Sequence, residues 1–284
     1  MRRRTIDEAE ANSLIAGLAA DDWQVPAETR PFDVIMQLAP HLASPDPTLR
    51  DEGIIALLGT WIYERDLLSP GELEELLAMA VSDDMLMRDI GSSGTDAVFA
   101  RSFSLLPIAL VLLCDNRHPF LDHETWQHVV ERVADYCRRE TDFRSRVPGK
   151  GFAHAPAHAA DVLDEIVRSR YADGETAIVA WEALAGLVSR CPTVFDCDED
   201  LRLSVPLAAM IAAGHTTVAR LCEHMAAALP AADDPSAEAQ VRRTNWRHLT
   251  RSLYFQLLHG GPVRRDRLAP LVALDATLVP DGLS

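Results

Sequence analysis

Apolar residues recur at spacings of three and four along almost the whole of this 284-residue chain. This period puts the apolar side chains on one face of an α-helix, whereas a half-buried strand needs alternation with a period of two. No stretch alternates for long enough to predict a strand. The pattern predicts about twelve helices, over residues 6–20, 31–42, 49–63, 70–81, 96–113, 125–139, 156–168, 175–189, 201–213, 216–229, 237–259 and 264–278.

Helix start signals support several of these boundaries. Ser69-Pro70-Gly71-Glu72 places a capping serine, a first-turn proline and a reciprocal glutamate in the order of a capping box. Asp122 precedes the segment His123-Glu124-Thr125 in a similar way, and Asp46-Pro47 leads into Thr48, which we expect to be a cap.

Helices of this length with short connections predict an all-α fold. We expect antiparallel helix pairs stacked as a HEAT- or armadillo-like α-solenoid or α/α superhelix, because the units follow one another at intervals near those of HEAT-type repeats. No linker interrupts the pattern, so we predict one domain over residues 1–284. It would consist of N-terminal helices in 1–45, a core in 46–260 and a C-terminal capping helix in 261–284.

The net charge of −16 limits the partners that the chain can have. Nucleic acids and anionic membranes attract an excess of Lys and Arg, so we expect neither as a partner. The longest apolar run, Leu105 to Cys114, is interrupted by Pro107 and is shorter than the ~20 residues that cross a bilayer. Met1 to Arg4 resemble the start of a signal peptide, but the acidic residues Asp7 and Glu8 follow. These observations predict a soluble, cytoplasmic protein.

Residues 144–154 break the helical pattern with Pro148, Gly149 and Gly151. Glycines allow the backbone to come close to another group, and the helix that follows would present its N-terminus to an anion. Lys150 is the only lysine among 27 basic residues. A compact ammonium at this place suggests a contact with an anion, while the alternative is an ordinary solvated basic turn.

The helix after this loop carries His154, His158, Asp161 and Glu165 at offsets of 0, 4, 7 and 11, which form one stripe. Two imidazoles and a carboxylate on one face can hold a divalent metal ion. Without metal, a neutral histidine can act as a general base while the carboxylate orients its ring. The alternative is that both histidines are structural, since this spacing is common by chance.

Several segments resemble a bacterial family described as domain of unknown function 2785. The strongest match is Asp142-Phe143-Arg144 followed by Val147-Pro148-Gly149-Lys150-Gly151-Phe152-Ala153-His154, with His158, Ala160 and Asp161. Further matching stretches lie at 49–52, 61–62, 68–73, 95–104, 119–121, 199–203 and 245–254. The resemblance implies an all-helical, HEAT-like fold and implies no activity.

Within such a fold, polar residues at the matching positions could converge on one pocket. These residues are Asp51, Glu52, Asp96, Arg101, Lys150, His154, His158 and Asp161. Burying such a set is costly unless its members pair with one another or bind a ligand. The leading hypothesis is a small-molecule site for an anionic or polyhydroxylated compound, either catalytic or dependent on a divalent metal.

In that hypothesis His154, His158 and Asp161 are the catalytic residues or metal ligands, and Lys150 and Arg101 contact the anion. Asp51, Glu52 and Asp96 would complete the substrate site. The alternative is a non-catalytic scaffold that binds a protein partner or forms a homodimer. The two hypotheses differ in geometry. A catalytic site gathers these side chains in one concave pocket, whereas a scaffold spreads them over the surface in separate salt bridges.

Overall fold

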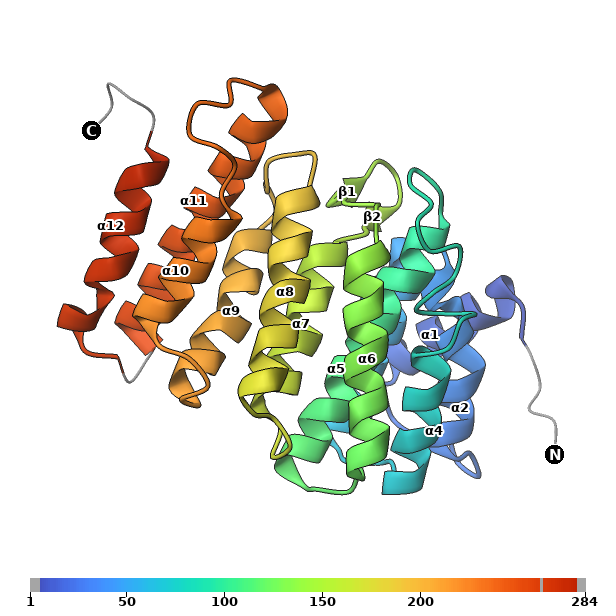
Figure 1. The fold of residues 1–284 in the computed structure, drawn as a ribbon. Coiled ribbons are helices and arrows are strands. Elements are labelled where there is room, and N and C mark those ends of the chain that lie inside the picture. The colour runs from blue at the N-terminus through green and yellow to red at the C-terminus, as the bar shows by residue number, and fades with distance from the viewer. Residues whose placement is uncertain (1–5, 261–262, 280–284) are drawn as a thin grey trace.

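The computed structural model describes residues 6–260 and 263–279, and almost all of its regular structure is helical (Figure 1). The helices are α1 (Glu8–Ala20), α2 (Pro31–Leu38), α3 (Ala56–Leu58), α4 (Pro70–Ala80), α5 (Ala97–Arg117), α6 (His123–Arg139), α7 (Ala155–Arg168), α8 (Gly174–Arg190), α9 (Glu199–Ala212), α10 (Val218–Ala228), α11 (Ala237–Gly260) and α12 (Ala269–Leu278). The predicted all-α class is therefore confirmed. Arg2 to Arg4, and the ends of the expected capping segment 261–284, lie outside the described residues.

The helix start signals act largely as expected. Ser69 and Glu72 form the capping box of α4, and the carboxylate of Asp122 accepts the backbone N–H of Thr125 at 2.7 Å. The start at Thr48 differs, because the carboxylate of Asp46 accepts the N–H of Thr48 at 2.9 Å and so provides the cap.

The expected helix over 49–63 is not a regular α-helix. Wider π-helical turns, Thr48–Ile55 and Gly59–Glu64, flank the short α3. π-Helical turns are rare in proteins, and those that occur often lie at functional sites. The spacing of apolar residues cannot distinguish a π-helical turn from an α-helical turn. The backbone hydrogen bond of a π-helical turn spans only one residue more.

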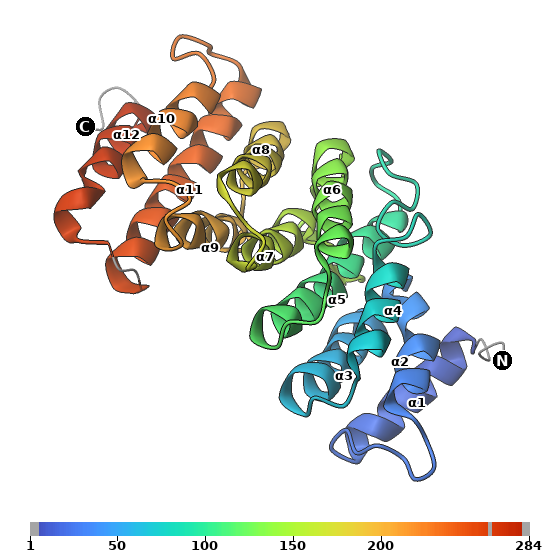
Figure 2. The same cartoon turned by 60° about the horizontal axis from the view of Figure 1, so that its bottom comes forward.

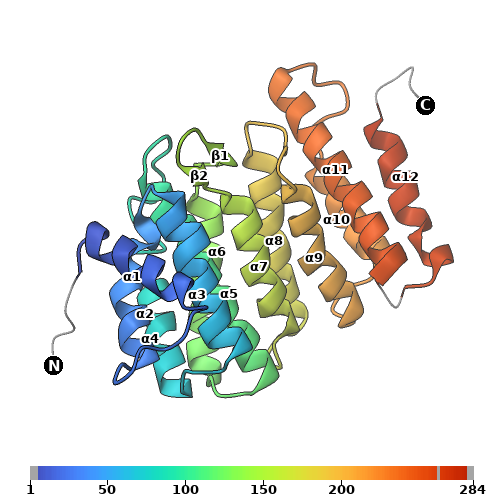
Figure 3. The ribbon, with the colours of Figure 1, turned by 180° about the vertical axis from the view of Figure 1, so that it is seen from behind.

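The helices lie in two layers. The helices α5, α7, α9 and α11 pack side by side in sequence order, and α4, α6, α8 and α10 lie on their outer side (Figure 2). The layers follow an arc, with α3, α5, α7 and α9 along its inner side. The N-termini of α5, α7 and α9 all lie at one edge, next to the hairpin of β1 (Arg146–Val147) and β2 (Gly151–Phe152) (Figures 1 and 3). This hairpin, which the sequence pattern did not predict, supplies the only strands among the described residues.

Helix α5 forms much of the core. It is long and apolar enough to cross a bilayer by length and composition, with a mean hydropathy of 2.1 over its most apolar window, but 67 % of that window is buried inside the protein. A central helix of a globular fold has the same properties, because it is apolar all round.

A buried ion pair joins α5 to the end of α6. The Nε and Nη2 atoms of Arg101 donate to the two carboxylate oxygens of Glu140 at 2.7 and 2.9 Å, and both side chains are fully buried. The other guanidinium donors reach the carbonyl oxygens of Arg88, Asp89 and Ser92. The pair therefore holds the loop before α5 against the loop after α6.

Asp142 extends this connection between the two loops. Its carboxylate accepts the N–H of Gly94 at 2.9 Å and forms an ion pair with Arg144 at 2.6 Å. Arg144 also donates to the carbonyl oxygen of Thr95 at 2.7 Å. These bonds place the hairpin above the N-terminus of α5.

Replacing Glu140 by glutamine should destabilise the protein, because Arg101 then keeps a buried charge without a counter-ion. Loss of one partner of a buried pair costs about 3–5 kcal/mol. We expect a decrease of that size in the free energy of unfolding, measured in urea by circular dichroism. Arg139→Ala removes a half-exposed ion pair with Asp135 on α6 and should change the same quantity by no more than about 0.5 kcal/mol. Equal effects of the two substitutions would contradict the role of Glu140.

Candidate functional site

The hairpin of β1 and β2 lies against the π-helical segment that begins at Thr48. Gly151 has a φ of +74°, and a Cβ atom there would lie 2.7 Å from the Cβ of Pro47. Both facts require glycine at this position. The close approach expected from the glycines is therefore an approach to another part of the same chain.

Arg50 fixes this approach. Its Nη2 donates to the carbonyl oxygens of Lys150 and Phe152 at 2.8 and 3.1 Å, which are the two residues on either side of Gly151. The guanidinium lies 4.1 Å from the ring centroid of Phe99 and is fully buried. Burial lowers the pKa of Arg50 to about 10, so the group stays charged at neutral pH. No local sequence pattern indicates this role of Arg50, because its acceptors are backbone atoms about a hundred residues away.

Lys150 is paired within the protein. Its ammonium donates to both carboxylate oxygens of Asp96 at 2.7 Å, and the two side chains are about 40 % exposed. Asp96 is the residue before the first turn of α5, so the pair ties the hairpin to that helix. The carboxylate occupies the place where an anionic ligand was expected.

His154 lies at the junction between the hairpin and α7. It has left-handed backbone angles (φ 55°, ψ 33°), and its ring stacks on Phe152 at 5.0 Å. Its Nε2 lies 2.8 Å from the carbonyl oxygen of Cys197 and 3.3 Å from Oε1 of Glu199. A proton on Nε2 satisfies both acceptors, so His154 connects the start of α7 to the start of α9.

Glu199 is buried at the other end of this contact. Burial acts to raise the pKa of Glu199, but hydrogen bonds from His154, the Ser145 hydroxyl and the Cys197 N–H outweigh it and lower the pKa to about 2. Glu199 is thus a carboxylate at all ordinary pH values, and its oxygens are occupied by donors from the protein.

His158 is buried one turn into α7. Its Nδ1 lies 3.1 Å from the carbonyl oxygen of Ser102, which can only accept, so Nδ1 carries the proton. The ring contacts Phe103 edge-on at 4.9 Å and lies 5.8 Å from the ring of His154. Burial, together with the nearby His154, lowers the pKa of His158 to about 3. The imidazole is therefore neutral at physiological pH.

The expected metal set of His154, His158 and Asp161 does not form a ligand group. Both oxygens of Asp161 accept hydrogen bonds from the guanidinium of Arg202 on α9, with Nε at 2.8 Å from Oδ1. Burial raises the pKa of Asp161, and Arg202 opposes this shift. The two histidines are neighbours, but the carboxylate is directed to another partner.

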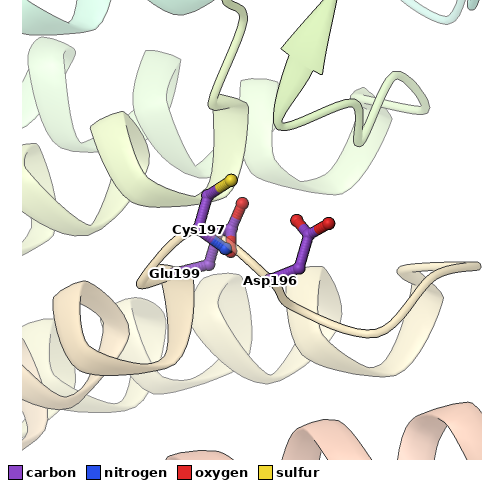
Figure 4. Close-up of side chains that lie close together, drawn as sticks. All are labelled: Asp196, Cys197 and Glu199. Carbon is purple, nitrogen blue, oxygen red and sulfur yellow. The ribbon is translucent and has the colours of Figure 1, made fainter.

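One group of potential metal ligands does come together in the described part of the chain. Atoms of Asp196, Cys197 and Glu199 lie within 4.8 Å of one another, just before α9 (Figure 4). Glu199 is already bonded to His154 and Ser145, and Asp196 is exposed. This group has the character of an acidic helix start rather than a prepared metal site.

The remaining expected residues differ in their surroundings. Asp51 is half-buried, and burial raises its pKa while the charge of Arg50 lowers it. Glu52 is exposed, and Arg101 belongs to the buried pair with Glu140. We use the name hairpin cluster for the residues that surround the hairpin edge: Arg50, Asp51, Asp96, Lys150, His154, His158 and Glu199. Most of its polar atoms are bonded to other parts of the protein.

An open groove of about 280 Å³ lies elsewhere, between α3, α5 and α7 on the inner side of the arc. We call it the inner groove. Its floor consists of half-buried aliphatic side chains, among them Ile55, Leu106, Leu110 and Leu113. The leucines follow one another on α5 at spacings of four and three, a second apolar stripe that the sequence pattern contained.

Carboxylates from α7 form one wall of the inner groove. They belong to Asp161, Asp164 and Glu165. Burial raises the pKa of Glu165 as it does that of Asp161. Of the expected site residues, Asp161 lines this groove, and its neighbours there are acidic residues and not the two histidines.

The neutral state of His158 predicts a pH dependence of stability. The unfolded chain binds a proton at His158 as the pH falls through 6.5, whereas the folded chain binds it only near pH 3, so acid favours unfolding. Between pH 6.5 and 4.5, the wild type should lose about 2–3 kcal/mol more stability than His158→Asn, at about 1.4 kcal/mol per pH unit. Asparagine keeps a donor for the Ser102 carbonyl. Urea unfolding at the two pH values measures the difference.

His118→Asn, at an exposed ring just after α5, is the control for this measurement and should keep the pH dependence of the wild type. The same dependence in His158→Asn as in the wild type would contradict a neutral, buried imidazole.

Comparisons with known proteins identify the family. The family model described as "Protein of unknown function (DUF2785)" matches residues 86–255, which is more than half of the chain. Neither the curated proteins nor the solved structures contain a match. The matched region includes α5, the hairpin, α7 and α9, while the expected stretches at 49–52 and 68–73 lie before it. The resemblance seen in the sequence is confirmed, and the chain belongs to the DUF2785 family.

Proposed function

We propose that this protein binds a small organic molecule in the inner groove. Ligand sites are typically concave and mostly apolar, with a few polar groups whose pKa values are shifted by burial. The inner groove combines these properties, since an aliphatic floor faces carboxyl groups with raised pKa values. This combination is the observation that carries the proposal. The adjacent π-helical turns, which contribute Ile55 and Gly59, agree with it.

The hairpin cluster gives less support to a binding or catalytic role. An anion at Lys150 would have to displace Asp96, and Arg101 has no donor left for a ligand. A pKa near 3 makes His158 a weak base at neutral pH. We infer that the cluster is structural and holds the N-termini of α5, α7 and α9 in register.

We also infer that the helix pairs stack as a HEAT-like α-solenoid. The alternation of inner and outer helices and the arc in Figure 2 support this inference. In such a fold the inner surface is the usual binding surface, which agrees with the position of the groove.

The alternative function, a scaffold for a second copy of the chain, is favoured by one observation. Phe255 on α11 and Val272 on α12 are 56 and 57 % exposed, and they border a hollow of about 430 Å³ between these two helices. Exposed apolar patches often mark interfaces. The groove and this patch lie on different helices, so the two functions can be tested separately.

The first test fills the inner groove. Gly59 lines it, and a Cβ atom at Gly59 would meet nothing within 4 Å, so Gly59→Leu adds a side chain at the groove. The free energy of unfolding of Gly59→Leu should equal that of the wild type or exceed it by up to about 1 kcal/mol, because glycine is a poor helix former. Fragments that raise the melting temperature of the wild type by binding in the groove should not raise that of Gly59→Leu. A fragment library containing cationic, neutral and anionic compounds is screened on both proteins.

Gly17→Leu is the matched control, since an added Cβ at the helical Gly17 also meets nothing within 4 Å, but Gly17 lies on α1, outside the groove. It should retain every hit. Hits that Gly59→Leu retains, or the absence of any hit, would contradict the proposed function.

The second test concerns self-association. Sedimentation velocity at rising concentration should show dimers of the wild type and not of Phe255→Ser if the α11–α12 patch joins two copies. A monomer at all concentrations would remove this support for the scaffold.

A further inference from the structure

Three carboxylate residues of α7, Asp161, Asp164 and Glu165, form the acidic wall of the inner groove. Asp164 and Glu165 follow Asp161 on α7 by three and four residues, so each lies about one turn from Asp161, about 5–6 Å between Cβ atoms. The floor opposite is formed by Leu106 and Leu110 of α5. A molecule in the groove would therefore contact carboxylates along one side and aliphatic carbon along the other.

The carboxylates are only partly satisfied within the protein. Oδ2 of Asp164 accepts from Nε of Arg168 at 2.9 Å, whereas its Oδ1 is buried and accepts no hydrogen bond from any described residue. Glu165 accepts from the side-chain amide of Asn116 at 2.9 Å, and it has no ion-pair partner among the described residues. A buried acceptor without a donor is costly, and native proteins rarely leave one.

The charges of the wall also do not balance. Arg202 pairs with Asp161 and Arg168 pairs with Asp164, so two guanidinium groups face three carboxylates. Burial disfavours the charged forms of Asp161 and Glu165, and a cation next to them would reverse this effect. An anion would face the excess negative charge, and a neutral molecule would leave that charge uncompensated.

We propose that the ligand of the inner groove is a small aliphatic amine. Its ammonium group donates to the carboxylate of Glu165, next to the carboxylate of Asp164, and its alkyl chain lies on Leu106 and Leu110. An ammonium carries a positive charge and three donors, which matches a wall with one more carboxylate than guanidinium groups. This inference rests on the proposed function of the groove and replaces the expected anionic ligand with a cationic one.

The test uses three probes of equal length that differ in charge: hexylamine, 1-hexanol and hexanoate. Titrations of the 15N-labelled protein at pH 7 give dissociation constants and, from the amides whose resonances shift, the place of binding. We expect hexylamine to shift amides of α5 and α7 around Leu110 and Glu165. Hexanol should bind at least about tenfold more weakly and hexanoate more weakly still, because a charge-assisted hydrogen bond is lost.

Two substitutions probe the acidic wall. Asp164→Asn keeps the shape of the side chain and should weaken hexylamine about tenfold or more while leaving hexanol unchanged. Asp135→Asn is the matched control, because Asp135 also pairs with an arginine four residues later in a helix, but on α6 and outside the groove. It should not change either dissociation constant. Unfolding midpoints of both variants are measured alongside to verify that each is folded.

The outcomes separate the two proposals. If hexanol or hexanoate binds as tightly as hexylamine and this binding is lost in Gly59→Leu, the amine proposal is overturned. The groove then remains a ligand site. Equal hexylamine affinity in Asp164→Asn and Asp135→Asn would also overturn the amine. Hexylamine shifts that persist in Gly59→Leu would place the amine outside the groove and overturn both proposals.

Discussion

The burial of two guanidinium groups constrains the rest of this structure. Arg101 and Arg50 are both fully buried near the hairpin edge, and a buried charge is tolerated only when its donors find acceptors. Arg101 finds them in Glu140 and in the loop before α5, and Arg50 finds them in the carbonyl oxygens around Gly151. Each arginine thereby joins segments that are far apart in the sequence. Because both networks meet at the start of α5, the loops around it and the hairpin have one arrangement in which these donors, apart from Nε of Arg50, are satisfied.

This arrangement separates two kinds of polar residue. At the hairpin edge, Lys150 and Glu199 bond to partners within the protein and so connect helix N-termini. On the inner side of the arc, Asp164 and Glu165 line an open groove whose carboxylates outnumber the guanidinium groups that pair with them. The first set stabilises the packing of α5, α7 and α9, and that packing positions α7 to present the second set beside the leucines of α5. The first turns of α7 thus make structural contacts, and its later turns carry the carboxylates of the proposed ligand groove.

The sequence predicted the helices well and the site poorly, for different physical reasons. Helix positions depend on the local period of apolar residues and on caps such as Ser69, and both are visible within a few neighbouring residues. The partners of the polar residues depend on tertiary contacts: Arg202 is 41 residues from Asp161, and Arg50 bonds to backbone atoms that any residue could supply. His154, His158 and Asp161 follow one another at the start of α7, but they contact different neighbours. His154 has a left-handed backbone, and Asp161 is hydrogen-bonded to Arg202. The groove needs three helices at once, so no single pattern revealed it.

Hydrogen exchange of residues 141–154 tests the central claim most directly, since this segment has little regular structure yet is held by the buried arginine networks. The N–H groups of Asp142, Ala153 and His154 donate to Glu140, Ser145 and Arg144 within it. The account predicts that these amides exchange as slowly as those of α5 and α7, because they open only when the helices separate. Exchange of the segment at the rate of an unstructured loop, with α5 and α7 still protected, would contradict it.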